Sequence, residues 1–221
     1  AEGLPTPGFA VVRSVADIAR VNLPYPLFAK PLAEGTGKGI DQHSKIENPA
    51  QLKKVCSRLL NMHQQPAMVE TYLSGREFTV GIVGTGDKAR VIGTMEIEIL
   101  ADGEPAIYSY LNKEECETRI RYSALRDPAV KQPVEELALG CYRVLECRDG
   151  GRVDIRCDQK GQPYFLEINP LAGLHPTHSD LPMIAAQEGM RYDELIDAIL
   201  RSALERTKQE RKADGKRACI I

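Results

Sequence analysis

The stretch GRVDIRCDQKGQPYFLEIN (Gly151–Asn169) decides the fold, because it contains two short strands separated by the turn residues Gln159–Gly161. Side chains alternate between the two faces of a strand. One face of the first strand is therefore polar and carries Arg152, Asp154 and Arg156, whereas the residues between them are apolar and need a core. The pattern predicts a β-hairpin with one buried face and one polar face.

The second strand of this hairpin alternates in the same way. We expect Phe165, Glu167 and Asn169 on the polar face. The residues between them are expected on the opposite face: Tyr164, Leu166 and Ile168. The polar faces coincide only when even-numbered residues of the first strand pair with odd-numbered residues of the second, for example Asp154 with Glu167 and Arg152 with Asn169. We expect a turn centred on Lys160-Gly161 to give this register.

The polar face would bring together two carboxylates, an amide oxygen and a guanidinium. Mg²⁺ is usually held by one or two carboxylates together with substrate phosphates. An arginine beside the metal can stabilise an oxyanion or a transferring phosphoryl group. From alternation alone a second interpretation stays open, namely a solvated hairpin face whose charges alternate without function.

The composition is that of an ordinary globular protein, with 221 residues, 43% of them hydrophobic and 27% charged, and a formal net charge of −2. A chain of this length can bury a core, as one domain or as two small ones. The balanced charge offers no field that would attract nucleic acid, and no apolar run is long enough to cross a bilayer. The six cysteines form no C-x-x-C pair, which predicts reduced thiols in a cytoplasmic protein.

The chain divides into two parts with different patterns. Residues 9–74 alternate strand and helix patterns, and the residues from 75 onward begin with two β-rich runs joined by the hairpin signal Thr85–Lys88. The strands expected in the first part are Pro7–Val12, Pro26–Pro31 and Pro66–Leu73. The expected helices are one after Ser14, one after Asn48, Asp127–Cys147 and Tyr192–Arg206. These patterns indicate units at 1–74 and 75–207, followed by a charged tail at 208–221 that we expect to be a frayed helix end.

A glycine-rich turn follows a lysine at the end of a strand. Lys30 precedes the segment Glu34–Gly39, in which backbone N–H groups could cradle a phosphate while the lysine reaches it. The turn is not a Walker P-loop, because Gly39 follows Lys38 in place of Ser or Thr. Taken alone, the segment fits a plain connection equally well.

A third polar segment, Glu70–Leu73, is followed closely by Glu77. Glu70 lies at the end of an expected strand and could bind an adenine amino group through its carboxylate or its backbone carbonyl. Glu77 could accept hydrogen bonds from ribose hydroxyls. Taken alone, both acids would be interpreted as solvated strand ends.

The segment that contains His175, His178 and Asp180 resembles a zinc site only superficially. The two histidines are separated by a proline-containing tripeptide and do not share a helix face. No cysteine or third histidine lies close to them in the sequence. We therefore reject zinc here.

These pieces, in this order, resemble the ATP-grasp superfamily and, within it, the D-alanine–D-alanine ligase family. The similarity covers nearly the whole chain, through the motifs GLPTPGF, KPLAEGTGKGI, VETYLSGREFTV, YSYLNK, GRVDIRCD, FLEINPLAGLHPTHSDLP and EGMRYDELI. The EIN ending before a glycine-bearing loop and the spacing from Asp154 to Glu167 make the match specific. The resemblance implies an α+β fold of the ATP-grasp type, with two α+β subdomains, largely antiparallel sheets and ATP bound between them.

The resemblance also implies roles for individual residues. Asp154, Glu167 and Asn169 would bind two Mg²⁺ ions, with Mn²⁺ as a substitute. Arg152 and the backbone N–H near Gly173 would stabilise the tetrahedral oxyanion, and Lys113 would act with them on the phosphates. The residues expected to contact ATP are Lys30, Glu34, Thr36, Glu70, Thr71, Leu73, Glu77 and Lys113. The residues expected to contact the substrate are Thr36, Ser179 and Asp180.

The chemistry of this family is transfer of phosphate from ATP to a carboxylate, followed by addition of an amine and loss of phosphate. The resemblance therefore predicts a cytoplasmic ATP-dependent carboxylate–amine ligase, with small amino-acid-like substrates and with a homodimer as a candidate assembly. The N-terminal domain of the family, which supplies the pocket for the first substrate, is missing from these 221 residues. We expect the chain alone to bind nucleotide and to turn over little.

Departures from the family pattern lie on the substrate side. Thr36-Gly37 replaces two serines, Ser109 replaces Asp, Glu114 replaces Tyr, and Asp180 replaces Leu. The loop after Asn169 also carries an extra residue. Two alternatives therefore stay open: a ligase that acts on another amino acid or acid, and a nucleotide-binding module without catalysis.

Overall fold

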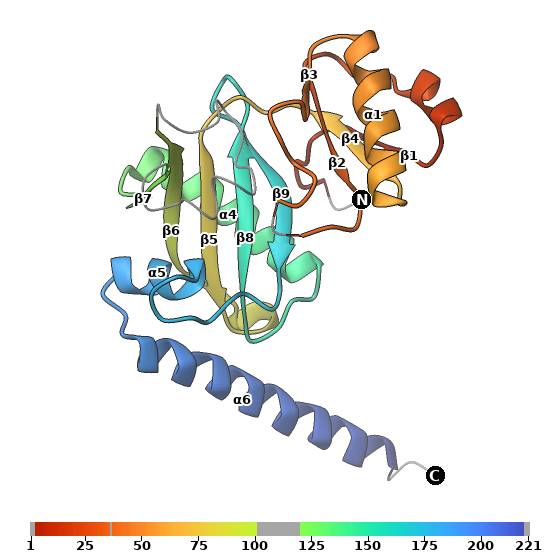
Figure 1. Ribbon diagram of the computed structural model, residues 1–221. Helices are drawn as coiled ribbons and strands as arrows, with labels where there is room; N and C mark the ends of the chain where they lie inside the picture. The colour runs from red at the N-terminus through yellow and green to blue at the C-terminus, as the bar shows by residue number, and fades with distance from the viewer. Residues whose placement is uncertain (1–2, 36, 101–119, 219–221) are drawn as a thin grey trace.

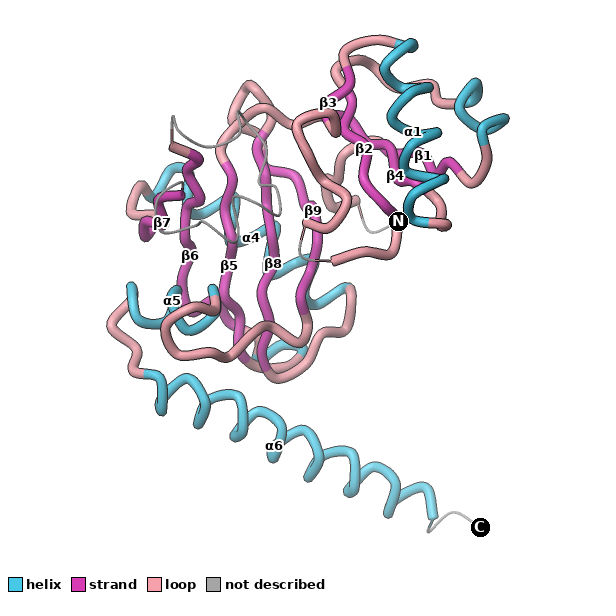
Figure 2. The backbone as a smooth tube through the Cα atoms, viewed as in Figure 1, coloured by secondary structure: helices cyan, strands magenta, loops and turns pink. Residues whose placement is uncertain are grey.

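The computed structural model describes residues 3–35, 37–100 and 120–218, with side chains up to residue 208, and it shows two antiparallel sheets with helices against them (Figure 1). The smaller sheet and the larger sheet lie next to each other, with the chain crossing between them after Thr71. A long C-terminal helix extends away from the larger sheet. Figure 2 traces the same path by secondary structure.

The smaller sheet has four strands in the order β1 (Phe9–Val12), β4 (Ala67–Thr71), β2 (Leu27–Pro31) and β3 (Lys45–Ile46), and every pair is antiparallel. Each expected strand of this part is present but is shorter than predicted at one or both ends. The segment after Ser14 is the 3-10 helix η1 (Val15–Arg20) rather than an α-helix. Asp17 closes a capping box at this start by accepting a hydrogen bond from the Ser14 backbone N–H at 2.8 Å.

Helix α1 (Pro49–His63) covers one face of this sheet, and its start follows the predicted cap. The Asn48 side chain accepts a hydrogen bond from the Gln51 backbone N–H at 3.0 Å, and Pro49 occupies the first turn. The apolar residues of α1 recur at helical spacing and pack against the sheet in one core: Leu52, Val55, Cys56 and Leu59.

The larger sheet has five strands in the order β7 (Ile120–Ala124), β6 (Arg90–Ile99), β5 (Glu77–Val83), β8 (Gly150–Cys157) and β9 (Pro163–Asn169). The predicted β5–β6 hairpin is confirmed, with the short 3-10 helix η2 (Gly86–Lys88) in its turn. Helix α4 (Pro128–Val144) packs against one face and begins at Asp127 as predicted, but ends three residues before Cys147.

Helix α5 (Asp180–Gln187) packs against the other face of the larger sheet, where two glycines make room for it. Gly81 of β5 pairs with Gly93 of β6. A Cβ atom at Gly81 would lie 3.2 Å from Ile184, and one at Gly93 would lie 2.9 Å from the same side chain. The close approach of α5 therefore depends on the absence of side chains at both positions.

The hairpin of β8 and β9 has the predicted pairing at its functional end, with Asp154 opposite Glu167 and Arg152 opposite Asn169. The turn does not produce this register, because next to it Arg156 pairs with Tyr164, an even-numbered residue with an even-numbered one. A β-bulge between Asp154 and Ile155 shifts the pairing by one residue.

The bulge also corrects the predicted alternation along β9. Phe165 was expected on the polar face with Glu167, and Leu166 on the opposite face. In the structure Phe165 packs against the core of the larger sheet, and Leu166 lines the cavity between the sheets. Because the bulge places one extra residue in β9, the side chains between the bulge and the turn lie on the opposite faces from those predicted.

The last helix, α6 (Tyr192–Ala218), is longer than predicted, because it continues beyond Arg206 into the segment expected to fray. Ser202 and Arg206 of this helix fix it to the larger sheet through a part-buried polar contact. Asp149 accepts hydrogen bonds from Arg206 at 2.7 Å, from Ser202 at 3.0 Å and from Thr85 at 3.1 Å. No helix among residues 3–35, 37–100 and 120–218 is long and apolar enough to cross a membrane.

Candidate active site

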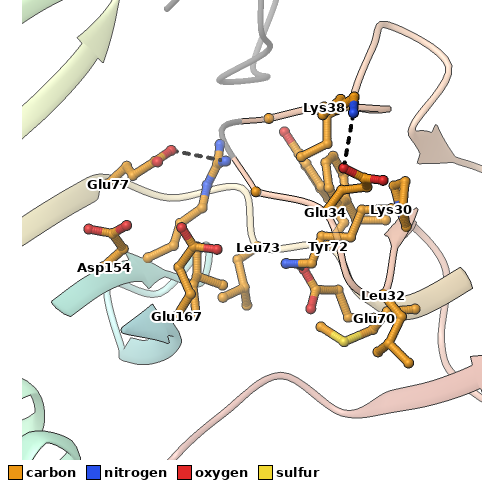
Figure 3. A pocket seen from close by; sticks show the side chains of 18 of the residues that line it. Lys30, Leu32, Glu34, Lys38, Glu70, Tyr72, Leu73, Glu77, Asp154 and Glu167 are labelled. Atoms are coloured by element: carbon orange, nitrogen blue, oxygen red, sulfur yellow. Dashed lines mark ion pairs between the residues drawn. The ribbon is translucent and has the colours of Figure 1, made fainter. Parts of the chain in front are cut away.

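A cavity of about 280 Å³ lies between the two sheets and is lined by residues from both (Figure 3). The smaller sheet supplies one wall through β2, β4 and the glycine-rich turn, and β5, β8 and β9 supply the other. Ten predicted site residues line this cavity: Lys30, Glu34, Glu70, Thr71, Leu73, Glu77, Arg152, Asp154, Glu167 and Asp180. The structure thus brings together residues that are far apart in the sequence.

One end of the cavity is built around the carboxylate of Asp154. Arg152 donates to both of its oxygens, from Nε at 2.9 Å and from Nη2 at 3.0 Å. Thr79 of β5, which is fully buried, donates its hydroxyl hydrogen at 2.8 Å, and the Asn169 amide donates at 3.2 Å. Asp154 is therefore held by donors from three strands.

The guanidinium of Arg152 has a second carboxylate partner, because its Nη1 donates to Asp180. Asp180 is in the first turn of α5, where a negative charge is favoured by the helix dipole. Burial disfavours the charged guanidinium, but the surrounding carboxylates of Asp154, Asp180 and Glu167 outweigh burial and raise the pKa of Arg152. Arg152 is thus a permanently charged group within an excess of acid.

The donor set at this end suits a hard cation. Asp154 and Glu167 are cross-strand neighbours, and Asn169 contacts Asp154, so two carboxylates and an amide lie together. Such oxygens are the ligands that Mg²⁺ and Mn²⁺ take. In the described residues no group of three or more His, Cys, Asp or Glu side chains is placed to hold a metal ion. A cation here would therefore depend on Asp154, Glu167 and an amide or phosphate oxygen, and would share Asp154 with Arg152.

Two lysines line the cavity on the side of the smaller sheet, Lys30 from β2 and Lys38 from the glycine-rich turn. Lys30 pairs with the buried Glu70 at 3.0 Å, and Lys38 pairs with Glu34 at 3.4 Å (Figure 3). Gly39 has φ +80°, and a Cβ atom there would lie 2.5 Å from Pro31 Cγ, so the turn needs glycine at this position. Thr36 and Lys113, both predicted to contact ATP, lie outside the described residues.

The cavity is also lined by residues to which the sequence assigned no role. Tyr72 lines it together with Leu73, and the Tyr72 ring stacks on Phe28 with centroids 6.3 Å apart. Arg156 also lines it and pairs with Glu77 at 3.2 Å. The alternation of the first hairpin strand predicts Arg156 on the polar face, but the sequence assigns this residue no function.

Three further predicted residues lie close to this region without lining the cavity. Asn169 contacts Asp154, as described above. Ser179 accepts a hydrogen bond from the His175 backbone N–H at 3.0 Å, and a Cβ atom at Gly173 would lie 2.6 Å from its hydroxyl. In this structure the Ser179 hydroxyl closes the loop after β9, and Asp180 is the substrate-side residue that reaches the cavity.

The fold and the order of these motifs agree with known proteins. Residues 2–201 match the family model described as the D-ala D-ala ligase C-terminus. The chain belongs to the D-alanine–D-alanine ligase family. A D-alanine–D-alanine ligase of Bordetella avium is 33% identical over 216 residues, which are 96% of this chain and 65% of that protein.

Solved structures of this family share the fold of the chain. The D-alanine–D-alanine ligase of Bacillus anthracis complexed with ATP matches with a TM-score of 0.70 at 23% identity, over 95% of this chain and 64% of that one. The VanG D-Ala:D-Ser ligase of Enterococcus faecalis matches with a TM-score of 0.72 at 23% identity, over 91% of this chain and 57% of that one. The ATP-grasp fold predicted from the sequence is confirmed, and the chain spans less than two thirds of the length of these relatives.

Proposed function

We propose that the protein containing this chain is an ATP-dependent carboxylate–amine ligase that acts through an acyl phosphate. The observation that carries the proposal is the cavity between the two sheets, which joins lysines and a glycine-rich turn on one wall to Asp154, Glu167 and Arg152 on the other. A site with phosphate-binding groups and hard oxygen ligands on facing walls suits a nucleotide triphosphate and its cation.

The residues of the chain divide into groups along the cavity. Glu70, Thr71 and Leu73 would contact the adenine and Glu77 the ribose, while Lys30 and the turn would contact phosphates. Asp154, Glu167 and Asn169 would hold Mg²⁺ or Mn²⁺, which when bound would neutralise phosphate charge. The units 1–74 and 75–207 would form the two walls as separate subdomains.

Arg152 would act on the charge that develops during the reaction. Its guanidinium is buried, fixed and always protonated, so it can stabilise an oxyanion without reorganising. A carboxylate acylates an amine only after phosphorylation supplies a leaving group. Binding to the protein would then position the amine against the acyl phosphate. Lys113 and Thr36 are proposed to act with these groups, on the resemblance alone.

The substrates would be small and amino-acid-like, and the α5 end of the cavity would help to select them. Asp180 places a carboxylate where it shares the guanidinium of Arg152 with Asp154. This changes the charge beside the reacting groups relative to an apolar residue. A ligase for another amino acid or acid is therefore included in the proposal.

The test uses the intact protein that contains this chain, incubated with Mg²⁺ and ATP and with pairs drawn from a panel of D- and L-amino acids. Phosphate release that requires an amino acid, and that is lost in the Glu167→Gln variant, supports the ligase. ATP binding without substrate-dependent phosphate release across the panel supports instead the nucleotide-binding module.

A further inference from the structure

We propose that Arg156 forms a flat platform for the nucleobase in the cavity, beside Glu77 and one alternation along β8 from Asp154. The inference rests on the proposed function, because it assumes that the cavity binds a nucleotide. It adds a contact residue that neither the motifs nor the family resemblance assigned.

The position of Arg156 follows from β8. Arg152, Asp154 and Arg156 alternate along this strand and all line the cavity. Each step of two residues advances about 7 Å along a strand. If Asp154 lies at the phosphate end, Arg156 therefore lies one step farther, at a distance suited to the nucleoside.

Two neighbours fix the guanidinium of Arg156. Glu77, its cross-strand neighbour on β5, accepts from Nη1 at 3.2 Å, and the two side chains are 15% and 13% exposed. The guanidinium carbon of Arg156 also lies over the Tyr72 ring, 5.5 Å from its centroid. Tyr72 is itself nearly buried and packed against Phe28. A flexible side chain is thus held in one orientation in the cavity wall.

The surroundings favour an aromatic ligand over a phosphate at this point. Glu77 offsets the charge of Arg156, and the neighbouring lining is apolar, with Leu73, Ile97 and Leu166. A guanidinium is planar, weakly hydrated and able to stack on aromatic faces, so a charge-compensated arginine in an apolar wall suits a base. The same contact orients Glu77, which is proposed to accept from the ribose hydroxyls.

Stacking of a base on a side chain tolerates different bases and contributes to binding of each of them. Loss of such a contact by truncation typically weakens binding by about 5- to 150-fold. We therefore expect Arg156→Ala to weaken ATP binding about tenfold. It should leave the affinity for inorganic tripolyphosphate unchanged, because that ligand has no base.

The experiment measures binding of ATP and of tripolyphosphate, each with Mg²⁺, to the 221-residue chain by calorimetry. The variants are Arg156→Ala and Arg156→Lys, and the lysine variant should lose most of the ATP affinity because an ammonium has no flat face. Arg121→Ala is the matched control, because Arg121 forms an Arg–Glu pair of the same length, 3.2 Å, with Glu98 on the exposed edge of the same sheet. It should bind ATP like the wild type.

Three outcomes would overturn the inference. If Arg156→Ala binds ATP with wild-type affinity, the platform does not exist, and the ligase proposal is unaffected. Full ATP affinity in Arg156→Lys would mean that Arg156 contributes only charge. An equal loss for ATP and tripolyphosphate would place Arg156 on the phosphates. A wild-type chain that binds neither ligand would contradict the expected nucleotide binding by these residues, on which the inference rests.

Discussion

Replacing Arg152 with methionine should destabilise the chain when Mg²⁺ is absent and should make its stability depend strongly on Mg²⁺. The guanidinium is 14% exposed and lies between the carboxylates of Asp154 and Asp180, which are 15% and 19% exposed. Glu167 is close enough to add to the same field. Methionine keeps the length and the apolar stem of the side chain but leaves these acids without their shared cation.

The expected loss follows from the burial of this group. Removing one partner of a buried ion pair costs about 3–5 kcal/mol, because the remaining charge is left uncompensated. These side chains keep some exposure, so we take the lower end, about 3 kcal/mol. In a chain of this size that corresponds to a fall in Tm of about 6–12 °C.

Mg²⁺ should restore part of this loss. Two of the acids left by Arg152→Met, Asp154 and Glu167, are proposed metal ligands, and Arg152 no longer competes for the oxygens of Asp154. A ligand present at a hundred times its Kd stabilises the folded state by about 2.7 kcal/mol. The rise in Tm from chelator to saturating Mg²⁺ should therefore be larger in the variant than in the wild type.

Thermal unfolding with chelator and with Mg²⁺ measures both effects. Arg152→Lys should fall between the wild type and Arg152→Met, because it keeps the charge and loses the two-oxygen contact. Arg58→Met is the control, because its partner Asp41 is 41% exposed and such a pair contributes about 0–1 kcal/mol. If Arg152→Met matches this control in chelator, or gains no more from Mg²⁺ than the wild type does, the charge argument is wrong.

Three further predictions concern single contacts. Burial raises the pKa of Asp149, but hydrogen bonds from Arg206 and others outweigh burial and lower that pKa below its ordinary 3.8. The stability that this carboxylate contributes is therefore complete above pH 3.8 and is lost as the pH falls through the lower pKa of the folded state. The Tm difference between wild type and Asp149→Asn should thus be present at pH 7 and vanish in strong acid; a constant difference would contradict it. Asn48→Ala should lower the free energy of unfolding by about 1 kcal/mol in denaturant titrations through loss of the cap, whereas no change would mean that Pro49 alone fixes the start of α1. Thr79→Val should cost about 1.5–3 kcal/mol in the same titrations, because a buried bond to a charged acceptor is lost, and an unchanged midpoint would show that Asp154 does not need this donor.

Most of the fold could be predicted from the sequence because its signals are local. Asn48 with Pro49 marks the start of α1, and Asp127 with Pro128 marks the start of α4. The β5–β6 hairpin follows from its turn residues in the same way. The ends were less accurate, and α6 in particular extends beyond the predicted Arg206. Periodicity identifies an element better than it locates the residue at which packing stops supporting it.

The sequence predicted many of the residues that line the cavity but not the reason for their geometry. Asp154 and Glu167 face each other as expected, yet the turn alone would have paired Asp154 with a different residue. The bulge that corrects the register has no signature in the hairpin sequence, since no glycine or proline stands at Leu166. It reconciles two demands: the register next to the turn, which buries Phe165 opposite Ile155, and the burial of Ile168 opposite Val153 farther along.

Arg156 and Asp180 show a second limit, because their roles arise from contacts between distant segments. Arg156 meets Glu77 and Tyr72 only after β5 and the end of β4 are placed beside β8. Asp180 meets Arg152 only after the loop that follows β9 returns α5 to the sheet. Each side chain is unremarkable in its own segment, so local patterns give it no function.

The excess of acid around Arg152 indicates that this end of the cavity is arranged for a ligand rather than for stability alone. A buried ion pair is seldom worth more than well-packed apolar residues of the same volume. Here three carboxylates surround one guanidinium, which adds like-charge repulsion to the cost of desolvation. A bound cation would offset that repulsion, and it would be a second positively charged partner of Asp154 besides Arg152. The Mg²⁺ dependence of the stability of Arg152→Met therefore measures how far this end of the cavity requires positive charge. The measurement needs no turnover, so it does not depend on the identity of the substrates.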